Sequence, residues 1–462
     1  MRNRLCGKTF AIHTLGCKVN TCESAAIRLS LLGCGAVERS FDEIADIYIV
    51  NTCTVTNIAD RKSRQMLHRA RTMAPDALIV ATGCYVQEQY EEQMREAKVD
   101  LLVGNRRKGE IVTLINDVFA LLEQGKKGPF VYLAEESQEK VFEDLPAVRE
   151  QESARAFMKI QDGCNQFCSY CIIPFARGRI ASRSEESVLA EARLLAENGV
   201  KEIVLNGIHL SSYGLERYSV AEQAGLYVKD GELPLLPLLR SLSEIPGITR
   251  IRLGSLEPRA LTEETVAALS GIPKLCPQFH LSLQSGCDKT LAVMNRKYTT
   301  EEYAAVVERL RRAFDDPGIT TDIIVGFPGE SEEDFAQSLA FAERIAFSQV
   351  HVFPYSRRKH TVADRMEGQL TEAEKKSRVT CLIRAMKVCE KEFRERRIGV
   401  SSRVLFEERR DIDGEMCYVG YSREYVPFAL RSDEDLTNRE LDVTGTGLTS
   451  DNVVLSQETV AI

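Results

Sequence analysis

The chain of 462 residues lacks a long apolar run, because no stretch approaches the roughly 18 apolar residues of a membrane span. Its N-terminal apolar segment, residues 9–12, is also shorter than the roughly 7–15 residues at the centre of a secretory signal. These absences predict a cytoplasmic protein with no membrane partner. A basic excess is missing too: the formal net charge of −8 excludes a globally basic nucleic-acid coat, although not a local basic groove.

Cysteine and histidine are too sparse or too scattered for two common kinds of site. The 14 cysteines are about 3% of the residues, far below the density of a disulfide scaffold. The 6 histidines form no closely spaced pair of the kind that binds zinc, so no histidine metal site is predicted. In a long chain with reduced thiols, clustered cysteines instead indicate a metal or catalytic site.

Two successive alternations of strands and helices predict an α/β protein. In the first, strands are expected at 10–15, 44–50, 77–82 and 99–103, with helices between them. This order predicts a doubly wound parallel-sheet domain over residues 7–122. Residues 123–150 are charged and rich in glycine and glutamate, which is typical of a linker.

The second alternation lies within residues 151–390. It contains six strand candidates, at 157–161, 202–205, 250–253, 279–283, 321–325 and 349–353. Six βα units in succession predict a partial (β/α)6 barrel. Residues 391–462 form short alternating segments with glycine and Asp/Asn turns, which predict a small β-barrel or sandwich.

The strongest motif is a C-x3-C-x2-C run made by Cys164, Cys168 and Cys171, directly after the first strand of the second alternation. Three thiolates at this spacing suit three corners of an iron–sulfur cubane and leave its fourth iron open to a ligand. The alternative is a structural zinc knuckle with a distant fourth ligand, although no further cysteine or histidine pair lies nearby.

Three more cysteines, Cys17, Cys53 and Cys84, each follow a predicted strand of the first domain. Ligands of open α/β sheets sit beyond the carboxyl ends of the strands, so these thiols can converge on one point. Gly16 and Gly83 would let the backbone approach closely there. The alternative is three ordinary buried cysteines, which are common in cores. Cys22 is a rival ligand that we expect to be packed.

Together, the two cysteine sets resemble those of the radical S-adenosylmethionine (SAM) methylthiotransferases, and the resemblance covers nearly the whole chain. Supporting segments are 171–179, 182–183, 205–209, 284–286, 326–330 and 352–356. The resemblance implies two [4Fe-4S] clusters and SAM as cofactors. It also implies that the six cysteines are metal ligands with catalytic roles: the C-x3-C-x2-C cluster cleaves SAM, and the N-terminal cluster carries sulfur. The C-terminal module resembles the TRAM domain, an RNA-binding β-barrel.

Three branches of this family differ in substrate. They act on isopentenyladenosine in tRNA, on an aspartate of a ribosomal protein, or on threonylcarbamoyladenosine in tRNA. Segments 13–20, 51–56 and 159–164 are similar to the third branch. The resemblance therefore implies that C–H at C2 of this adenine, next to the anticodon, becomes C–S–CH3. Such an unactivated C–H bond requires a cofactor radical.

The resemblance also implies partners and leaves alternatives. The partners are the tRNA anticodon stem-loop, an electron donor such as flavodoxin or ferredoxin, and a sulfur donor. The isopentenyladenosine branch is the first alternative function. The ribosomal-protein branch and a non-catalytic iron–sulfur RNA-binding protein are the others.

Polar or small residues after the second to fifth strands of the (β/α)6 domain are predicted to contact SAM, from their positions and from the resemblance. They are Asn206, Gly207, Glu257, Gln284, Gly326 and Gly329. The alternative for each polar residue is a loop cap or a strand-end hydrogen bond.

Basic residues near both cysteine sets are predicted to contact RNA phosphates. They are Arg61, Lys62, Arg64, Arg177, Arg179 and Arg183, with a further basic run at 357–359. In the C-terminal barrel the predicted contacts are Arg403, Tyr421, Arg423 and Tyr425, whose aromatic rings would stack on bases. Residues 400–462 carry six arginines, no lysine and thirteen acidic residues, so a structural lid is the alternative role for this barrel.

Overall fold

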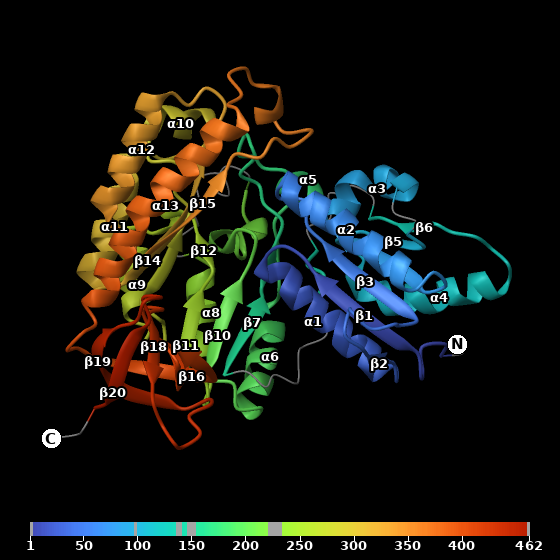
Figure 1. The fold of residues 1–462 in the computed structure, drawn as a ribbon, viewed down its shortest axis with the longest axis horizontal. Coiled ribbons are helices and arrows are strands. Elements are labelled where there is room, and N and C mark those ends of the chain that lie inside the picture. The colour runs from blue at the N-terminus through green and yellow to red at the C-terminus, as the bar shows by residue number, and fades with distance from the viewer. Residues whose placement is uncertain (1–2, 97–98, 135–140, 146–153, 220–232, 460–462) are drawn as a thin grey trace. The chain divides into compact units, whose positions relative to one another are not determined.

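The computed structural model describes residues 3–96, 99–134, 141–145, 154–219 and 233–459 (Figure 1). The chain divides into two units, each made of several segments. The first comprises Met1–Val148, Lys159–Ser184 and Ser356–Asp364, and the second Arg149–Met158, Glu185–Tyr355 and Arg365–Ile462. Within the described ranges, every helix is too short or too polar to cross a membrane.

The first unit is built on a parallel sheet with the strand order β2-β1-β3-β4-β5-β6. Its strands are β1 (Thr9–Thr14), β2 (Val37–Glu38), β3 (Ile47–Thr52), β4 (Leu78–Gly83), β5 (Leu101–Val103) and β6 (Phe130–Tyr132). Its larger helices are α1 (Lys18–Gly33), α2 (Asn57–Met73), α3 (Cys84–Glu96) and α4 (Ile111–Glu123), with a 3-10 turn η1 (Lys108–Glu110). The chain order reverses between β1 and β3, which is where open sheets bind ligands.

Alternate residues of each strand enter two different cores, one on each face of this sheet. On β3, Ile47 and Ile49 pack with residues of α1 and α4, whereas Tyr48 and Val50 pack with α2 and α3. Figure 1 shows the two pairs of helices on opposite faces of the sheet. The predicted doubly wound parallel sheet is therefore confirmed.

Two strands of this sheet were not predicted. β2 has only two residues, too few for any periodic pattern to emerge. β6 lies inside residues 123–150, so that part of the predicted linker is wrong: it pairs with β5 as an edge strand. The lysines and glycines just before it obscured a three-residue apolar strand.

The second unit contains the strands of the (β/α)6 domain, in chain order across two adjoining sheets. They are β7 (Arg155–Lys159), β10 (Glu202–Asn206), β11 (Arg250–Leu253), β12 (Ser255–Leu256), β13 (Gln278–Leu281), β14 (Gly318–Val325) and β15 (Gln349–Pro354). Only Gly254 separates β11 from β12, and its N–H still donates to Leu205 O at 2.8 Å. Counting β11 and β12 as one strand gives the six predicted strands.

Helices alternate with these strands along the chain. Those described are α6 (Glu185–Glu197), α8 (Leu235–Ser243), α9 (Glu263–Ser270), α10 (Asp288–Val293), α11 (Thr300–Ala313), α12 (Glu332–Ile345) and α13 (Glu372–Glu395). Three of them begin with a capping box, in which the N-cap hydroxyl and an acidic side chain satisfy amides that would otherwise lack partners. The N-caps are Thr299, Ser331 and Thr371.

The chain ends in a closed barrel with the strand order β16-β17-β18-β20-β19. Its strands are β16 (Ser401–Ile412), β17 (Glu415–Ser422), β18 (Pro427–Leu430), β19 (Glu440–Leu448) and β20 (Val454–Glu458). Phe393, near the end of α13, packs into the apolar core of this barrel with Phe406 and Phe428. The predicted small β-barrel is confirmed.

Candidate functional site

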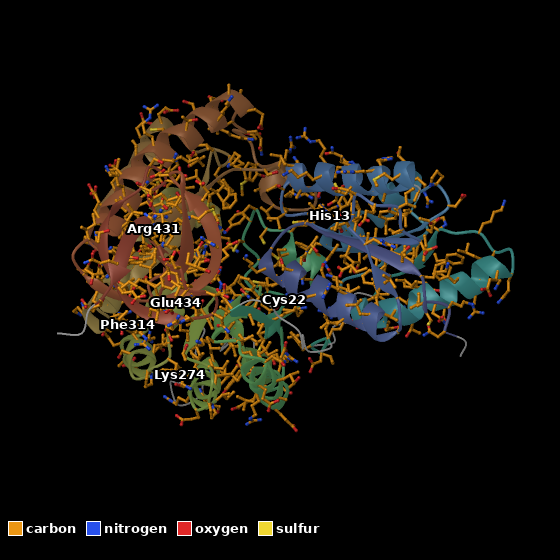
Figure 2. The ribbon with its side chains drawn as sticks, turned by 60° about the horizontal axis from the view of Figure 1, so that its bottom comes forward. His13, Cys22, Lys274, Phe314, Arg431 and Glu434 are labelled. Carbon is orange, nitrogen blue, oxygen red and sulfur yellow. The ribbon has the colours of Figure 1, made fainter. Side chains whose placement is uncertain are left out.

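Cys17, Cys53 and Cys84 each stand at the carboxyl end of a neighbouring parallel strand in the first unit. Cys17 is the N-cap of α1, Cys53 follows β3, and Cys84 begins α3 directly after β4. Gly16 has φ +101°, and a Cβ placed there would lie 2.8 Å from Cys53 Sγ. Glycine is therefore needed for the β1 and β3 loops to come this close. Cys22 lies farther along α1 and is half-buried (Figure 2).

These three thiols are close enough to influence one another electrostatically. Burial raises the pKa of Cys53 to about 12, and the neighbouring thiolates of Cys84 and Cys17 raise it as well. Forming all three thiolates without a cation is thus unfavourable, whereas iron would stabilise them. Within the described residues, no three His, Cys, Asp or Glu side chains surround a position for a single metal ion. A cubane is bound differently, with one thiolate on each iron.

Cys164, Cys168 and Cys171 lie in a loop that β8 (Gln161–Asp162) and β9 (Ala181–Ser182) close as an antiparallel pair. The loop contains the short helix α5 (Ile173–Ala176). Gly163 has φ +68°, and any Cβ there would overlap Arg179 O. Cys164 N donates to Gly178 O at 3.1 Å, and Cys171 N to Cys168 O at 3.0 Å. These turns keep the three cysteines on one short, defined segment.

Side chains of the first domain anchor this cysteine loop within the first unit. Asn105 Nδ2 donates to Ala176 O at 2.8 Å, and Arg106 donates to Arg177 O at 3.3 Å. The Arg177 side chain forms ion pairs with Glu23 at 2.9 Å and with Asp162 at 3.1 Å. Sequence reasoning missed Glu23, although Cys17, Asn20 and Glu23 are spaced three residues apart on α1.

Two predicted RNA contacts in this loop are wrong. Arg177 is buried in the ion pairs just described, and Arg183 is 6% exposed with its Nε on Asp144 at 2.8 Å. Arg179 is exposed and lies over the Phe167 ring at 4.6 Å, so its assignment to RNA stays a prediction. The sequence alone does not show which arginines of such a run are exposed and which are buried.

A cleft of about 500 Å³ lies beside α2 in the first unit. Its lining contains four basic and two acidic side chains together with two amides: Arg64, Arg357, Arg358, Lys359, Asp60, Asp364, Asn57 and Gln89. Arg358 is buried and pairs with Asp60 at 2.7 Å, and Arg357 pairs with Asp364 at 2.7 Å. The cationic surplus of this cleft therefore comes from Arg64 and Lys359. Arg61 and Lys62 are exposed on the same helix, α2.

In the second unit, the residues predicted to contact SAM do lie at strand ends. Asn206 is the last residue of β10, and Gly207 follows it. Gln284 follows β13 with φ +72°, an uncommon conformation for a non-glycine residue and typical of functional loops. Gly326 and Gly329 follow β14, and a Cβ at Gly326 would lie 2.6 Å from Lys375 Cγ. The close packing of α13 is thus one reason for glycine at position 326.

Glu257 differs from the other predicted SAM contacts because this chain already supplies its counter-charges. Its carboxylate lies 3.0 Å from both Arg259 and Arg296 and 3.7 Å from His209 Nε2. Burial opposes ionisation, but Arg296 and His209 hold the pKa of Glu257 down to about 2. Glu257 therefore holds together the loops around it, and its contact with SAM stays a prediction.

The C-terminal barrel docks on β10 and β11 through residues that the sequence analysis assigned to RNA. Tyr421 and Tyr425 stack with ring centroids 4.7 Å apart, and Arg155 lies over both rings. Arg423 donates to Leu275 O at 2.8 Å. These side chains fix the barrel to the (β/α)6 domain, as the structural alternative implies. All three are partly exposed, so their RNA contacts stay predictions. Arg403 is exposed beside Asp442, and its RNA contact stays a prediction.

Two fully buried arginines complete this docking surface. Arg250 donates to Glu440 at 2.7 Å, to Tyr421 O at 2.7 Å and to Arg403 O at 2.8 Å. Arg252 pairs with Glu202 and donates to Arg423 O at 2.9 Å. The acceptors on the barrel lose contact with water when the interface forms, and the two arginines replace water as their hydrogen-bond donors. Charged groups elsewhere on the barrel, such as Arg431 and Glu434, are exposed (Figure 2).

The buried carboxyl of Glu143 is expected to make the stability of the first unit depend on pH. It accepts a hydrogen bond from Gly109 N at 2.7 Å, and burial raises its pKa to about 7 despite Lys159 and Lys108 nearby. The protonated form is favoured in the folded state, so its stabilising effect is full below pH ~4.5 and is lost as pH rises towards 7. We expect Glu143→Gln to unfold like the native protein at pH 4.5 and to be about 1–2 kcal/mol more stable at pH 8.

Urea unfolding at both pH values measures this difference. Glu110→Gln is the matched control, because Arg107 lowers the pKa of that exposed carboxyl and its loss should not stabilise the protein at pH 8. Equal stability of native and Glu143→Gln protein at pH 8 would contradict the prediction.

Comparison with known families identifies matches in both halves of the chain. The model of the radical SAM superfamily matches residues 158–342, and that of the uncharacterized protein family UPF0004 matches residues 9–104. The first match contains Cys164, Cys168 and Cys171, and the second contains Cys17, Cys53 and Cys84.

Individual relatives are similar over most of their length. The threonylcarbamoyladenosine tRNA methylthiotransferase MtaB of Bacillus subtilis is 37% identical, covering 94% of this chain and 93% of the relative. The enzyme of that name from Aquifex aeolicus is 39% identical, covering 87% of this chain and 93% of the relative. The tRNA-2-methylthio-N(6)-dimethylallyladenosine synthase of Caldicellulosiruptor saccharolyticus is 36% identical, covering 82% of this chain and 77% of the relative.

Among solved structures, the radical SAM methyltransferase TsrM of Kitasatospora setae is similar in fold. The TM-score is 0.54 at 14% identity, and the similarity covers 78% of this chain and 77% of that one. That structure contains cobalamin and a [4Fe-4S] cluster. The comparison supports the assignment of an α/β radical SAM fold to this chain.

Proposed function

This chain belongs to the methylthiotransferase family of radical SAM enzymes, and we propose that it converts N6-threonylcarbamoyladenosine in tRNA, next to the anticodon, to the 2-methylthio derivative. The observation that carries the proposal is the presence of two separate cysteine sets in one unit, where Arg177 from the loop of one set contacts Asn20 and Glu23 beside the other. Relatives of this name are 36–39% identical to the chain, whereas the dimethylallyladenosine synthases are 34–36% identical.

Membership of the radical SAM family implies SAM and one [4Fe-4S] cluster. We assign this cluster to Cys164, Cys168 and Cys171, and a second one to Cys17, Cys53 and Cys84. When bound, these groups supply a carbon-centred radical from SAM at Cys164, Cys168 and Cys171, and sulfur at Cys17, Cys53 and Cys84. Residues 7–122 would then hold the sulfur site, residues 151–390 the radical site, and residues 391–462 would be the barrel that supports it.

The residues of this chain fit such groups. The Arg177 guanidinium interacts electrostatically with Cys17, Cys53 and Cys84, and its Nε is a buried donor with no hydrogen-bond partner among the described residues, so it is available to a bound anionic group. Asn206, Gly207, Gln284 and Gly329 are proposed to bind SAM, because polar and small residues at strand ends can hold its carboxylate, ribose and adenine. Gly326 and Glu257 are assigned to the SAM site as well, where Glu257 orients Arg296 and His209.

The proposed substrate defines further partners and a compartment. A radical SAM reaction requires an electron donor, for which flavodoxin or ferredoxin is the proposed class, and methylthiolation requires a sulfur donor. Because tRNA is modified where it is used, we place the reaction in the cytoplasm.

Nucleoside mass spectrometry on tRNA tests this function, comparing cells that lack the protein with cells in which it is restored. We expect 2-methylthio-threonylcarbamoyladenosine to disappear and its precursor to accumulate in the first. If the 2-methylthio derivative of isopentenyladenosine changes instead, the proposed substrate is wrong and the isopentenyladenosine alternative is right. If neither nucleoside changes, the substrate is not the adenosine next to the anticodon.

The basic cleft beside α2, together with the exposed Arg61 and Lys62 on that helix, is proposed to hold the phosphate backbone of this tRNA. Replacing Lys62 and Lys359 by alanine should weaken tRNA binding about tenfold at physiological salt, because each phosphate contact releases counterions. The salt dependence of log K should lose roughly one unit of slope per residue. Filter binding over a salt series measures both quantities. Lys126→Ala with Lys127→Ala is the matched control, since these exposed lysines lie in the α4–β6 loop. Equal slopes for the two pairs would contradict an RNA role for the cleft.

A further inference from the structure

Five charged side chains form a buried network between the two cysteine sets of the first unit. Glu23 of α1 pairs with Arg177 at 2.9 Å, with Lys159 at 2.8 Å and with Lys108. Asp162 pairs with Lys159 at 2.5 Å and with Arg177 at 3.1 Å. The side chains of Glu23, Lys108 and Arg177 are completely inaccessible to solvent. The network thus joins the first domain to the loop that carries Cys164, Cys168 and Cys171.

The network contains one more cation than anions. Burial acts to raise the pKa of Glu23, but Arg177, Lys108 and Lys159 hold it well below its usual range, so this carboxyl is ionised. With Glu23 and Asp162 both negative, three cations face two anions within the network. Glu143, which interacts electrostatically with Lys159 and Lys108, adds a third negative charge only above pH ~7. A buried surplus charge is costly unless an opposite charge lies close to it.

The surplus charge is directed at the N-terminal cysteine set. Arg177 NH2 donates to Asn20 Oδ1 at 2.6 Å, and Asn20 Nδ2 donates to Leu15 O at 2.7 Å and to Thr52 O at 3.0 Å. Those carbonyls stand within two residues of Cys17 and Cys53 in the chain. Arg177 also interacts electrostatically with the thiols of Cys17, Cys53 and Cys84.

We propose that Arg177 is a positioning residue that offsets the negative charge of the cluster on Cys17, Cys53 and Cys84 and thereby raises its reduction potential. The inference rests on the proposed function for the existence of that cluster. Net charge and hydrogen bonds to sulfur are two of the factors that set the potential of an iron–sulfur cluster. Arg177 lies six residues after Cys171, so the radical-site loop itself supplies the charge that tunes the sulfur site.

The backbone around Arg177 fixes this charge in place. Arg106 and Asn105 bind the carbonyls of residues 177 and 176. Gly178 has φ +76°, a backbone conformation that favours glycine, and the Arg106 guanidinium packs 2.1 Å from where a Cβ would lie. The guanidinium of Arg177 therefore cannot move away from the cysteine set without breaking several buried contacts at once.

The test is a redox titration of the N-terminal cluster alone, followed by electron paramagnetic resonance without tRNA. Cys164, Cys168 and Cys171 are replaced by alanine in every protein, which removes the other cluster and leaves the hydrogen bonds of Arg177 intact. In this background we expect Arg177→Gln to lower the midpoint potential and Glu23→Gln, the opposite charge change in the same network, to raise it. Arg179→Gln, an equal charge change on an exposed side chain of the same loop, should leave the potential unchanged.

Arg177→Lys separates charge from packing, because it keeps the positive charge and loses the paired hydrogen bonds. Its potential should stay near that of the background protein, while its thermal unfolding temperature falls. Unchanged potentials in Arg177→Gln and Glu23→Gln, or shifts of both in the same direction, would overturn the proposal. If Arg177→Gln loses the cluster, Glu23→Gln decides: a raised potential supports the proposal, and an unchanged or lowered potential overturns it. If the background protein itself binds no iron, the second cluster of the proposed function is wrong, which is a separate outcome.

Discussion

Replacing Cys17, Cys53 and Cys84 together by alanine is expected to abolish methylthio-nucleoside formation while SAM is still cleaved. The reason is that the three thiols stand at neighbouring strand ends of the first sheet, apart from the loop that carries Cys164, Cys168 and Cys171. Product should fall by at least two orders of magnitude, since changing even the outer partners of metal ligands costs about 10–100-fold. Iron should fall from roughly eight to roughly four atoms per chain. Mass spectrometry of 5′-deoxyadenosine and of the modified nucleoside measures the two activities in one reaction.

Two single variants are controls for this prediction. Cys6 is exposed near the N-terminus and Cys22 is half-buried on α1, and neither follows a strand directly. Cys6→Ala and Cys22→Ala should therefore both keep full iron content and full product. A triple variant that still methylthiolates normally would refute the sulfur site. Loss of product in Cys22→Ala alone would show that this thiol is a ligand in place of one of the three.

Arg250→Ala is expected to destabilise the docked C-terminal barrel by about 3–5 kcal/mol, the usual cost of breaking a buried ion pair from one side. Arg250 is 0% exposed, and its three hydrogen bonds end on Glu440 and on two backbone carbonyls of the barrel. Alanine would remove a buried donor from each of these three acceptors. Hydrogen exchange of the β16–β20 amides, followed by mass spectrometry, measures the loss locally, because opening of the interface should release their protection.

Arg403→Ala is the matched control for Arg250→Ala. Arg403 lies on β16 and pairs with Asp442 at 2.9 Å, but both side chains are about half exposed. Such a surface pair contributes about 0–1 kcal/mol, so exchange should change little. Similar protection of the barrel amides in Arg250→Ala and in the native protein would show that Arg250 is not what fixes the barrel.

The candidate cluster residues could be found from sequence because each follows a strand, and strand ends of a parallel sheet share one edge. Cys17, Cys53 and Cys84 are separated by about thirty residues each, yet the rule for open sheets brings them to one edge. The doubly wound sheet, the six βα units and the terminal barrel were predictable for the same reason: long periodic segments dominate them. The two-residue strand β2 and the edge strand β6 carry too few residues for such a pattern.

The role of the basic residues could not be predicted, because it depends on partners far away in the chain. Arg177 is buried by Glu23, which is 154 positions earlier, and Arg252 is buried by groups of the barrel 170 positions later. From sequence, these arginines look the same as the exposed Arg179. Tyr425 likewise has φ +70°, in a turn whose shape brings its ring against Tyr421 and Arg155.

The segment Ser356–Asp364 has a consequence for how the chain is made. Arg358 neutralises Asp60 and bonds to Asn57, about 300 positions earlier in the sequence. At about 5–20 residues per second, a ribosome needs roughly 15–60 s to travel from one to the other. During that interval the Asp60 carboxyl has Thr54 and Arg64 nearby but lacks the ion pair with Arg358 that it has when buried. The last step in closing this domain must therefore wait for residues encoded three-quarters of the way along the message.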